Sequence, residues 1–378
     1  MDWFTNPKQN EVKKLITQLA DASRRNAAAQ ELIRLGADSA APLIDALQTQ
    51  DLNLLAIYQQ ILARIPAASP ELTKALKSAH PIIRGRVAEV FGLSKDKTAI
   101  PALIEALHGE FFTVRARAAL ALANIGDRLV ISQLLPLLKD QEDEVRMAVC
   151  MALGIFKDPS TFDELANVTL DDPIIEVRQA AVKALGDSKN PAAIPFLMEA
   201  LRDSFWWFER EQSVRVLMNA IEGMGSSVVE PLIEALADRE GTVRKLAAKM
   251  LGNLRDVRAI EELGMTLYDL HHEVSQTAAQ ALAQFSAPAI DVLAEALIHP
   301  EASVREHAIL GLGQIHDERV IPYLIEMLHD PAREVKRQAI QSLAGIKDRR
   351  AIPALQELAG DRTDRELAAF AKEVIAKL

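Results

Sequence analysis

The chain has 378 residues, of which 49% are hydrophobic and 25% are charged, and its formal net charge is −10. This composition excludes a disordered or fibrous protein, and the negative charge repels phosphate backbones, so we expect no nucleic-acid partner. One cysteine excludes a disulfide framework, and no run of eighteen apolar residues predicts a membrane span. We therefore expect a folded cytoplasmic protein.

An apolar residue followed by arginine recurs along the chain at intervals of about 30 residues. The pairs are Ile83-Arg84, Val114-Arg115, Val145-Arg146, Val177-Arg178, Val214-Arg215, Val243-Arg244 and Val304-Arg305, with the variants Val274-Ser275 and Val335-Lys336. Small residues such as Ala180, Ala181 and Ala184 follow on one helical face and permit close helix packing. A glycine after most pairs, as at Gly92 and Gly154, predicts the helix end through a left-handed cap.

A second helical pattern precedes each of these pairs. Ile100, Leu103, Ile104 and Leu107 have the spacing of one helical face, and the same pattern returns near residues 194–201 and 321–328. Two short helices per unit, counted along the chain, predict an all-α fold of about twelve helical pairs. We expect one continuous repeat array over residues 1–378, with polar cap repeats at 1–36 and 351–378.

These motifs resemble the HEAT repeat, in particular the short bacterial version named after phycobilisome lyases. Residues 99–107 and 177–186 carry the resemblance, which covers nearly the whole chain and weakens at residues 50–80. It implies a right-handed α-α superhelix, an armadillo-like solenoid, whose second helices line a concave face. A repetitive surface of this kind favours broad contact with a protein, so we expect a scaffold or assembly factor with no cofactor.

The resemblance leaves two enzymatic alternatives open. The first is a phycobilin lyase or chromophore-protein chaperone, in which the groove would hold a bilin or another flat apolar ligand. The second is an oxidoreductase similar to deoxyhypusine hydroxylase, whose repeats carry His-Glu pairs after the arginine position. This chain has only the reversed pair Glu306-His307 there, so it lacks the converging ligands of a di-iron centre.

Three other features have an ordinary structural interpretation. The arginines of the repeated apolar-arginine pairs, which we call the arginine ladder, resemble a set of ties between repeats, to turn carboxylates such as Asp143, Glu144 or Glu176. His271-His272-Glu273 lies in a predicted polar turn, where adjacent side chains diverge, so we expect no metal site. Cys150 lies on an alanine-rich helix face, and we expect no catalytic residues in the chain.

Two features remain as candidate partner-binding sites. Arg86 and Arg117 lie outside the ladder, one repeat apart, and are predicted to make surface contacts or to pair the propionates of a bilin. The interval between Val177 and Val214 is longer than the others and contains Phe205, Trp206, Trp207 and Phe208. These aromatic residues predict either an adhesive projecting loop or rings that fold back to cover a gap between repeats.

Overall fold

The computed structural model describes residues 7–77, 80–209 and 211–378, although of Pro7, Phe208, Glu209 and Glu211 it describes only the backbone. The described residues form helices and no strands, and these helices make twelve pairs, with one short helix, α14, as an extra element. The predicted all-α fold of helical repeats is confirmed. No helix in the described part is long and apolar enough to cross a membrane.

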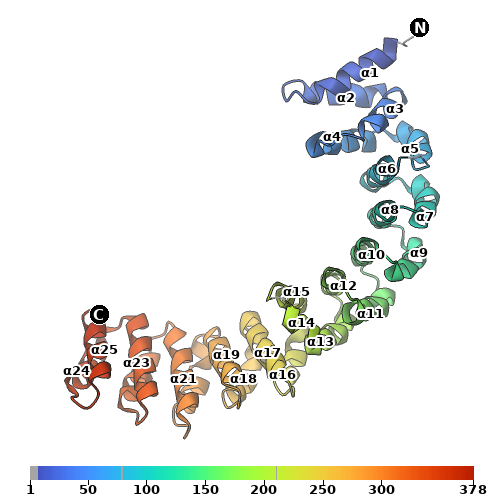
Figure 1. Cartoon of the computed structure of the whole chain (residues 1–378). Coiled ribbons are helices and arrows are strands. Elements are labelled where there is room, and N and C mark those ends of the chain that lie inside the picture. Colours follow the sequence, from blue (N-terminus) through green and yellow to red (C-terminus); the bar gives the residue numbers. More distant parts are fainter. Residues whose placement is uncertain (1–6, 78–79, 210) are drawn as a thin grey trace. The chain divides into compact units, whose positions relative to one another are not determined.

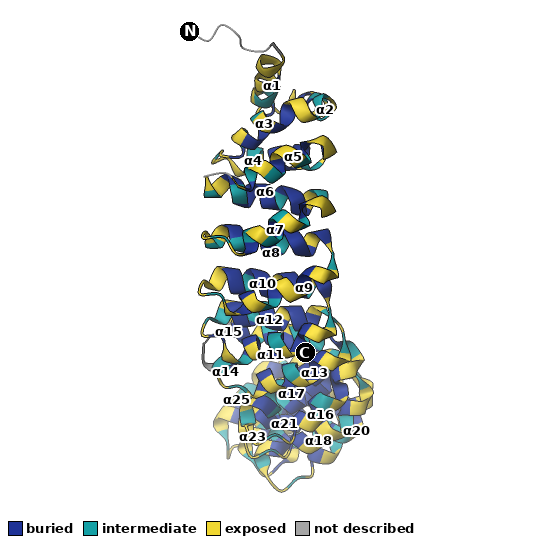
Figure 2. Cartoon of the chain, turned by 90° about the vertical axis from the view of Figure 1, so that its right-hand side faces the viewer, coloured by how far each residue is buried: buried dark blue, intermediate teal, exposed yellow. Residues whose placement is uncertain are grey.

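The chain divides into two compact units, Met1–Ala193 and Ile194–Leu378. The helices of unit 1 are α1 (Pro7–Gln18), α2 (Arg25–Leu35), α3 (Ala37–Ala46), α4 (Leu52–Ala63), α5 (Ser69–Ala75), α6 (Pro81–Ser94), α7 (Ile100–Leu107), α8 (Phe112–Ile125), α9 (Ile131–Leu134), α10 (Asp143–Phe156), α11 (Phe162–Asp171) and α12 (Ile175–Asp187). Its second helices, from α4 to α12, form one row and its first helices another (Figure 1). Buried residues recur on every helix of this stack (Figure 2).

Unit 2 repeats the same plan. Its helices are α13 (Ile194–Arg202), α14 (Phe205–Glu209), α15 (Glu211–Glu222), α16 (Val229–Ala235), α17 (Gly241–Leu254), α18 (Ile260–Thr266), α19 (His272–Ala283), α20 (Ile290–Ala296), α21 (Ala302–Gln314), α22 (Val320–Glu326), α23 (Arg333–Ile346), α24 (Ile352–Gly360) and α25 (Arg365–Ile375). Each second helix packs on its own first helix and on the second helix of the next repeat.

The glycines that follow the ladder arginines do not end their helices, which corrects the sequence expectation. Gly92, Gly154 and Gly252 lie inside α6, α10 and α17, each of which ends two residues later. A Cβ atom on Gly252 would lie 2.8 Å from the Cα of Ala281, so the missing side chain allows α17 and α19 to touch. The left-handed caps are instead Lys95, Lys157, Gly126, Arg255 and Lys347.

Ladder arginines join consecutive repeats through paired hydrogen bonds. In α10, the Nε and Nη2 atoms of Arg146 donate to the two carboxylate oxygens of Asp172 at 2.6 and 3.0 Å. Its Nη1 donates to the carbonyls of Asp140 and Gln141 in the preceding turn. Asp172 also accepts from the backbone N–H of Ile174, so one carboxylate caps its turn and binds the previous repeat.

The same arrangement, which we call a rung, joins Arg115 to Asp140, Arg146 to Asp172, Arg244 to Asp269 and Arg305 to Asp330. Burial by itself raises the pKa of the Asp330 carboxyl, but hydrogen bonds from Arg305 and from the Ala332 N–H hold that pKa below its ordinary value. The prediction that the ladder arginines link neighbouring repeats is therefore confirmed, but the carboxylates that they bind differ from those expected. Asp143, Glu144 and Glu176, which the sequence suggested, are exposed.

One rung is rebuilt from other residues. Ser275 stands where the arginine is expected, and His299 stands at the aspartate position of that turn. The Ser275 hydroxyl donates to the carbonyl of Leu267 at 2.6 Å and lies 2.7 Å from Nδ1 of His307 on the next second helix. His307 is only 3% exposed, and its burial, with a smaller effect of the nearby His272, lowers the pKa of His307 to about 4.

We expect Asp172→Ala to destabilise unit 1 by about 3–5 kcal/mol, because Arg146 would remain buried without its counterion. The measurement is urea unfolding followed by circular dichroism. The control is Glu318→Ala, which removes an ion pair with Arg350 whose side chains are 80% and 53% exposed. That change should cost less than about 0.5 kcal/mol. Equal effects of the two substitutions would contradict a structural role for the rung.

We expect His307 to make the stability of unit 2 depend on pH. Its pKa of about 4 in the fold lies below the ordinary histidine value of 6.5, so the folded state binds fewer protons than the unfolded chain. Its contribution is therefore fully present above about pH 6.5 and is lost as the pH falls toward 4, by up to roughly 3 kcal/mol. Urea unfolding of wild type and His307→Gln should diverge in this range. Parallel pH profiles of the two proteins would contradict it.

Candidate functional site

The aromatic insertion forms an extra helical turn, α14, at the start of unit 2. Trp206 is fully buried, and among the described contacts its indole Nε1–H has no hydrogen-bond partner. Phe205 and Trp207 are half-buried, and the Trp207 Nε1–H donates to the carbonyl of Leu201 at 3.1 Å. The side chain of Phe208 lies outside the described residues. Trp206 therefore has the position expected for a ring that folds back and fills a gap. Trp207 is the aromatic side chain that stays partly exposed.

Arg86 does not offer its charge at the surface, contrary to the sequence expectation. Its side chain is buried on α6, and Nη1 donates to the backbone carbonyls of Leu47 and Thr49 in the turn between α3 and α4 of the preceding repeat. The neighbouring ladder residue Arg84 finds Gly109 at the aspartate position and lies over the Phe111 ring instead, 4.7 Å from its centroid. Arg86 therefore links this repeat to the preceding one. Arg84 does not link it to the following repeat through a carboxylate, because Gly109 stands at the aspartate position.

Arg117 also contacts its neighbouring repeat. Its Nε lies 3.1 Å from a carboxylate oxygen of Glu89, which in turn accepts from the Gln59 amide at 2.5 Å. The Arg117 side chain crosses Gly85, where a Cβ atom would lie 2.8 Å from Nη1. About a third of the Arg117 side chain stays exposed, so the structure brings it to the surface but does not place it beside Arg86 as a free anion-binding pair.

Beyond α14, the helix α15 is rotated relative to the other second helices. In α17, the buried positions begin with Val243 and continue at Ala247 and Ala248. The equivalent buried positions of α15 are Ser213, Leu217 and Met218, one residue earlier than the Val-Arg motif predicts. Val214 is therefore half-buried and Arg215 is exposed, so Arg215 does not belong to the ladder. Arg202 of α13 binds Asp238 in its place, with Nε 2.9 Å from Oδ2.

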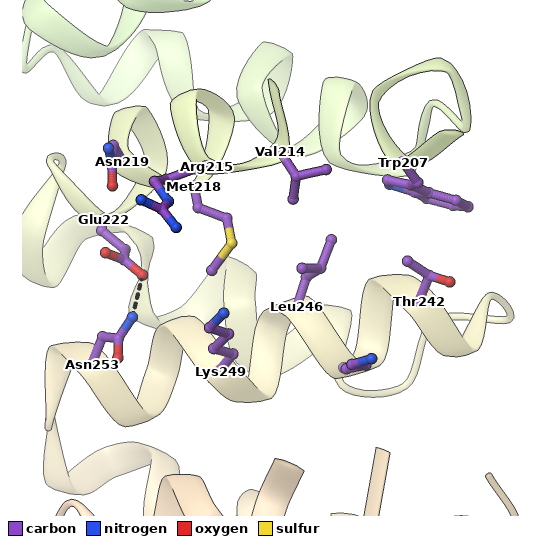
Figure 3. Close-up of a pocket in the computed structure, with 11 residues that line it drawn as sticks. Trp207, Val214, Arg215, Met218, Asn219, Glu222, Thr242, Leu246, Lys249 and Asn253 are labelled. Atoms are coloured by element: carbon purple, nitrogen blue, oxygen red, sulfur yellow. Dashed lines mark hydrogen bonds between the residues drawn. The ribbon is translucent and has the colours of Figure 1, made fainter. Parts of the chain in front are cut away.

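A groove of about 550 Å³ opens between α15 and α17. Its apolar lining comes from Val214, Met218, Leu246 and the Trp207 ring, and Figure 3 shows these side chains directed into the space between the two helices. Its polar lining comes from Arg215, Asn219, Glu222, Thr242, Lys245, Lys249 and Asn253.

The groove follows from larger side chains at positions that are small in other repeats. Glu222 occupies the position where α17 has Gly252, and its Oε1 accepts a hydrogen bond from the Asn253 amide at 2.7 Å. Leu217 and Met218 occupy positions where other second helices have alanines, as α17 has Ala247 and Ala248. Because helix separation depends on the side chains at the contact, α15 and α17 pack less closely than α17 and α19.

The charge of the groove opposes the charge of the chain. Arg215, Lys245 and Lys249 contribute three positive charges and Glu222 contributes one negative charge, although the chain carries a net −10. Lys245 is paired with the exposed Glu273 at 2.6 Å. Among the described residues, Arg215 and Lys249 form no ion pair. The groove therefore offers an apolar floor with basic side chains that suit carboxylates.

Cys150 has the buried position that the sequence indicates. Its side chain is 0% exposed on α10, and burial raises the pKa of the thiol to about 12. A protonated, covered thiol is a poor nucleophile, so Cys150 acts as a small core residue.

Comparison with known proteins agrees with this architecture. A family model of HEAT repeats matches residues 69–147, 131–218, 229–303 and 290–376, which together make up well over half of the chain. The chain belongs to the HEAT-repeat family. A comparison with curated proteins finds no significant match.

Several crystal structures share the fold of this HEAT-repeat chain. Kap121p bound to Pho4p has 14% sequence identity and a TM-score of 0.60, and the match covers 99% of this chain and 50% of that one. Kap121p bound to Nup53p has 15% identity and a TM-score of 0.59, with the same coverage. This chain thus spans about half the length of those karyopherin chains.

A complex of CpcE and CpcF, a phycocyanin lyase from Nostoc, is also similar in part. It has 22% identity and covers 59% of this chain and 92% of that chain, but its TM-score is 0.35. A likeness at that level carries no argument about function.

The sequence interpretation missed most of the groove. It assigned Arg215 to the ladder and gave no role to Met218, Leu246 or Lys249. A signal was present, because Leu217, Met218 and Glu222 break the pattern of small residues that other second helices keep. That signal could identify an irregular repeat. It could not predict the rotation of α15, because that rotation depends on how α14 packs against α15.

We expect Gly252→Ala to destabilise unit 2 by about 1–3 kcal/mol, because the new methyl group would overlap Ala281 of α19. Gly345→Ala is the matched control, since a Cβ atom there meets nothing within 4 Å. That control should keep its stability or gain up to about 1 kcal/mol from the higher helix propensity of alanine. Thermal unfolding monitored by circular dichroism compares the two, and equal melting temperatures would contradict the close-packing account.

Proposed function

We propose that this HEAT-repeat protein is a scaffold that binds an acidic, partly apolar peptide segment of a protein partner in the groove between α15 and α17. The observation that carries the proposal is the groove between α15 and α17, which combines an apolar lining with the basic side chains of Arg215, Lys245 and Lys249. The groove lies on the face formed by second helices, where the sequence analysis expected the partner.

The apolar and basic side chains of the groove favour a peptide that carries both an apolar side chain and carboxylates. A large apolar side chain of the peptide would cover Leu246, which is half-buried, and the small part of Met218 that is exposed. Carboxylates on either side would pair with Arg215 and Lys249, which form no ion pair with any described side chain. Trp207 closes one end and offers a flat ring for a further apolar contact.

The fold comparisons support binding of this kind without identifying the partner. Kap121p has been crystallised with Pho4p and with Nup53p bound, so the same architecture accommodates protein ligands. No observation on this chain favours a bilin over a peptide, and the basic groups that the sequence analysis assigned to propionates, Arg86 and Arg117, are engaged within the protein. Arg117 is retained as a secondary contact at most, through its exposed third.

The proposal is tested with a random peptide display library selected on the full chain, followed by fluorescence anisotropy of labelled selected peptides. We expect enrichment of Asp and Glu around one large apolar residue, and weaker binding as salt is raised. Lys249→Glu should lower the affinity at least about tenfold by placing like charges together. Leu246→Ala should also weaken binding, by removing apolar area from the floor.

The matched control is Arg239→Glu, which reverses one exposed charge in the same unit outside the groove. It should leave the affinity within about twofold. If Arg239→Glu weakens binding as much as Lys249→Glu, only the overall charge matters and the groove is not the site. Selection of peptides without acidic residues, or of none, would also overturn the proposal. A triple substitution of Phe205, Trp206 and Trp207 is unsuitable, since Trp206 belongs to the core.

A further inference from the structure

The rebuilt rung of unit 2 brings two histidines together. His272, at the start of α19, is exposed, and His307 of α21 is buried. Their Nε2 atoms lie 3.0 Å apart, and the rings meet edge to face with centroids separated by 4.4 Å. The sequence analysis read His271-His272-Glu273 as a polar turn because adjacent residues diverge. The second histidine of the pair comes from the next repeat, which only folding brings close.

The hydrogen bonds around His307 fix which of its nitrogens carries the proton. The Ser275 hydroxyl donates to the Leu267 carbonyl at 2.6 Å, so its oxygen is left to accept from Nδ1–H of His307 at 2.7 Å. Nε2 of His307 therefore keeps a free lone pair, directed at His272. A partner on the far ring nitrogen is also what orients most metal-binding histidines.

We propose that His272 and His307 bind one divalent transition-metal ion of the zinc type through their Nε2 atoms. Two imidazoles at ordinary zinc distances in a tetrahedral site have their nitrogens about 3.3 Å apart, close to the separation seen here. Small adjustments of the exposed His272 would admit the ion. Without metal, the same pair forms a single hydrogen bond from His272 to His307, which is the competing account.

The chain supplies two ligands to this site. Among the described residues, no third His, Cys, Asp or Glu lies close enough to complete a three-ligand group with this pair. The nearest sequence neighbour, Glu273, is held by Lys245 at 2.6 Å. Water therefore fills the other positions, and the affinity should be moderate.

The test is isothermal titration of the full chain with zinc chloride at neutral pH, after removal of metal with a chelator. We expect one zinc ion per chain. His272→Gln should weaken binding at least about tenfold, because it removes a ligand. His271→Gln is the matched control, since it changes the adjacent exposed histidine that does not face His307, and it should leave the affinity unchanged.

Ser275→Ala provides a second, independent variant. It keeps both ligands but removes the acceptor for Nδ1–H of His307, so the affinity should fall about 10- to 100-fold. Zinc should also raise the melting temperature of wild type but not of His272→Gln. Equal zinc binding by wild type and His272→Gln, or equal losses in His271→Gln and His272→Gln, would overturn the proposal and leave a histidine hydrogen bond. Absence of stoichiometric binding by wild type would do the same.

Discussion

The rung between a ladder arginine and the aspartate of the next turn is the interaction on which this structure depends. Hydrophobic packing alone does not fix how one helical repeat is oriented on the next, because the hydrophobic effect is not directional. The planar guanidinium of Arg146 or Arg305 supplies the direction, since it binds both carboxylate oxygens and two turn carbonyls at once. Each turn is thereby fixed against the preceding second helix.

A rung costs desolvation of two charges, so its geometry has to be satisfied completely. The described rungs meet this requirement, because each carboxylate also accepts from a backbone N–H of its own turn, as Asp330 does from Ala332. Where a partner is missing, the chain compensates locally. Gly109 leaves Arg84 without a carboxylate, and Arg86 then reaches back to carbonyls of the previous repeat. Arg202 replaces Arg215 beside Asp238 in the same way.

The two proposed sites lie where the repeat departs from its own pattern. At α15, Glu222 and the larger side chains of Leu217 and Met218 prevent close helix contact and open a groove. At α19, Ser275 leaves the space of an arginine, and His307 enters it with one nitrogen held and the other free. Regular repeats bury their side chains against each other, so they have little to offer a ligand. Irregular ones expose groups that packing has already oriented.

The sequence by itself determined the repeat, its length, the twelve helical pairs and the structural use of the ladder arginines. These features are set by local spacing: one helical face of apolar residues, small residues at contacts, and a charge at a fixed position. The tertiary structure decided how long the second helices run, which carboxylates the arginines bind, and that Trp206 is covered. It also decided that Met218 and Leu246 line one groove and that His272 meets His307. Those outcomes depend on the rotation of α15 and on distances between helices that are far apart in sequence, and no periodicity within one helix contains that information.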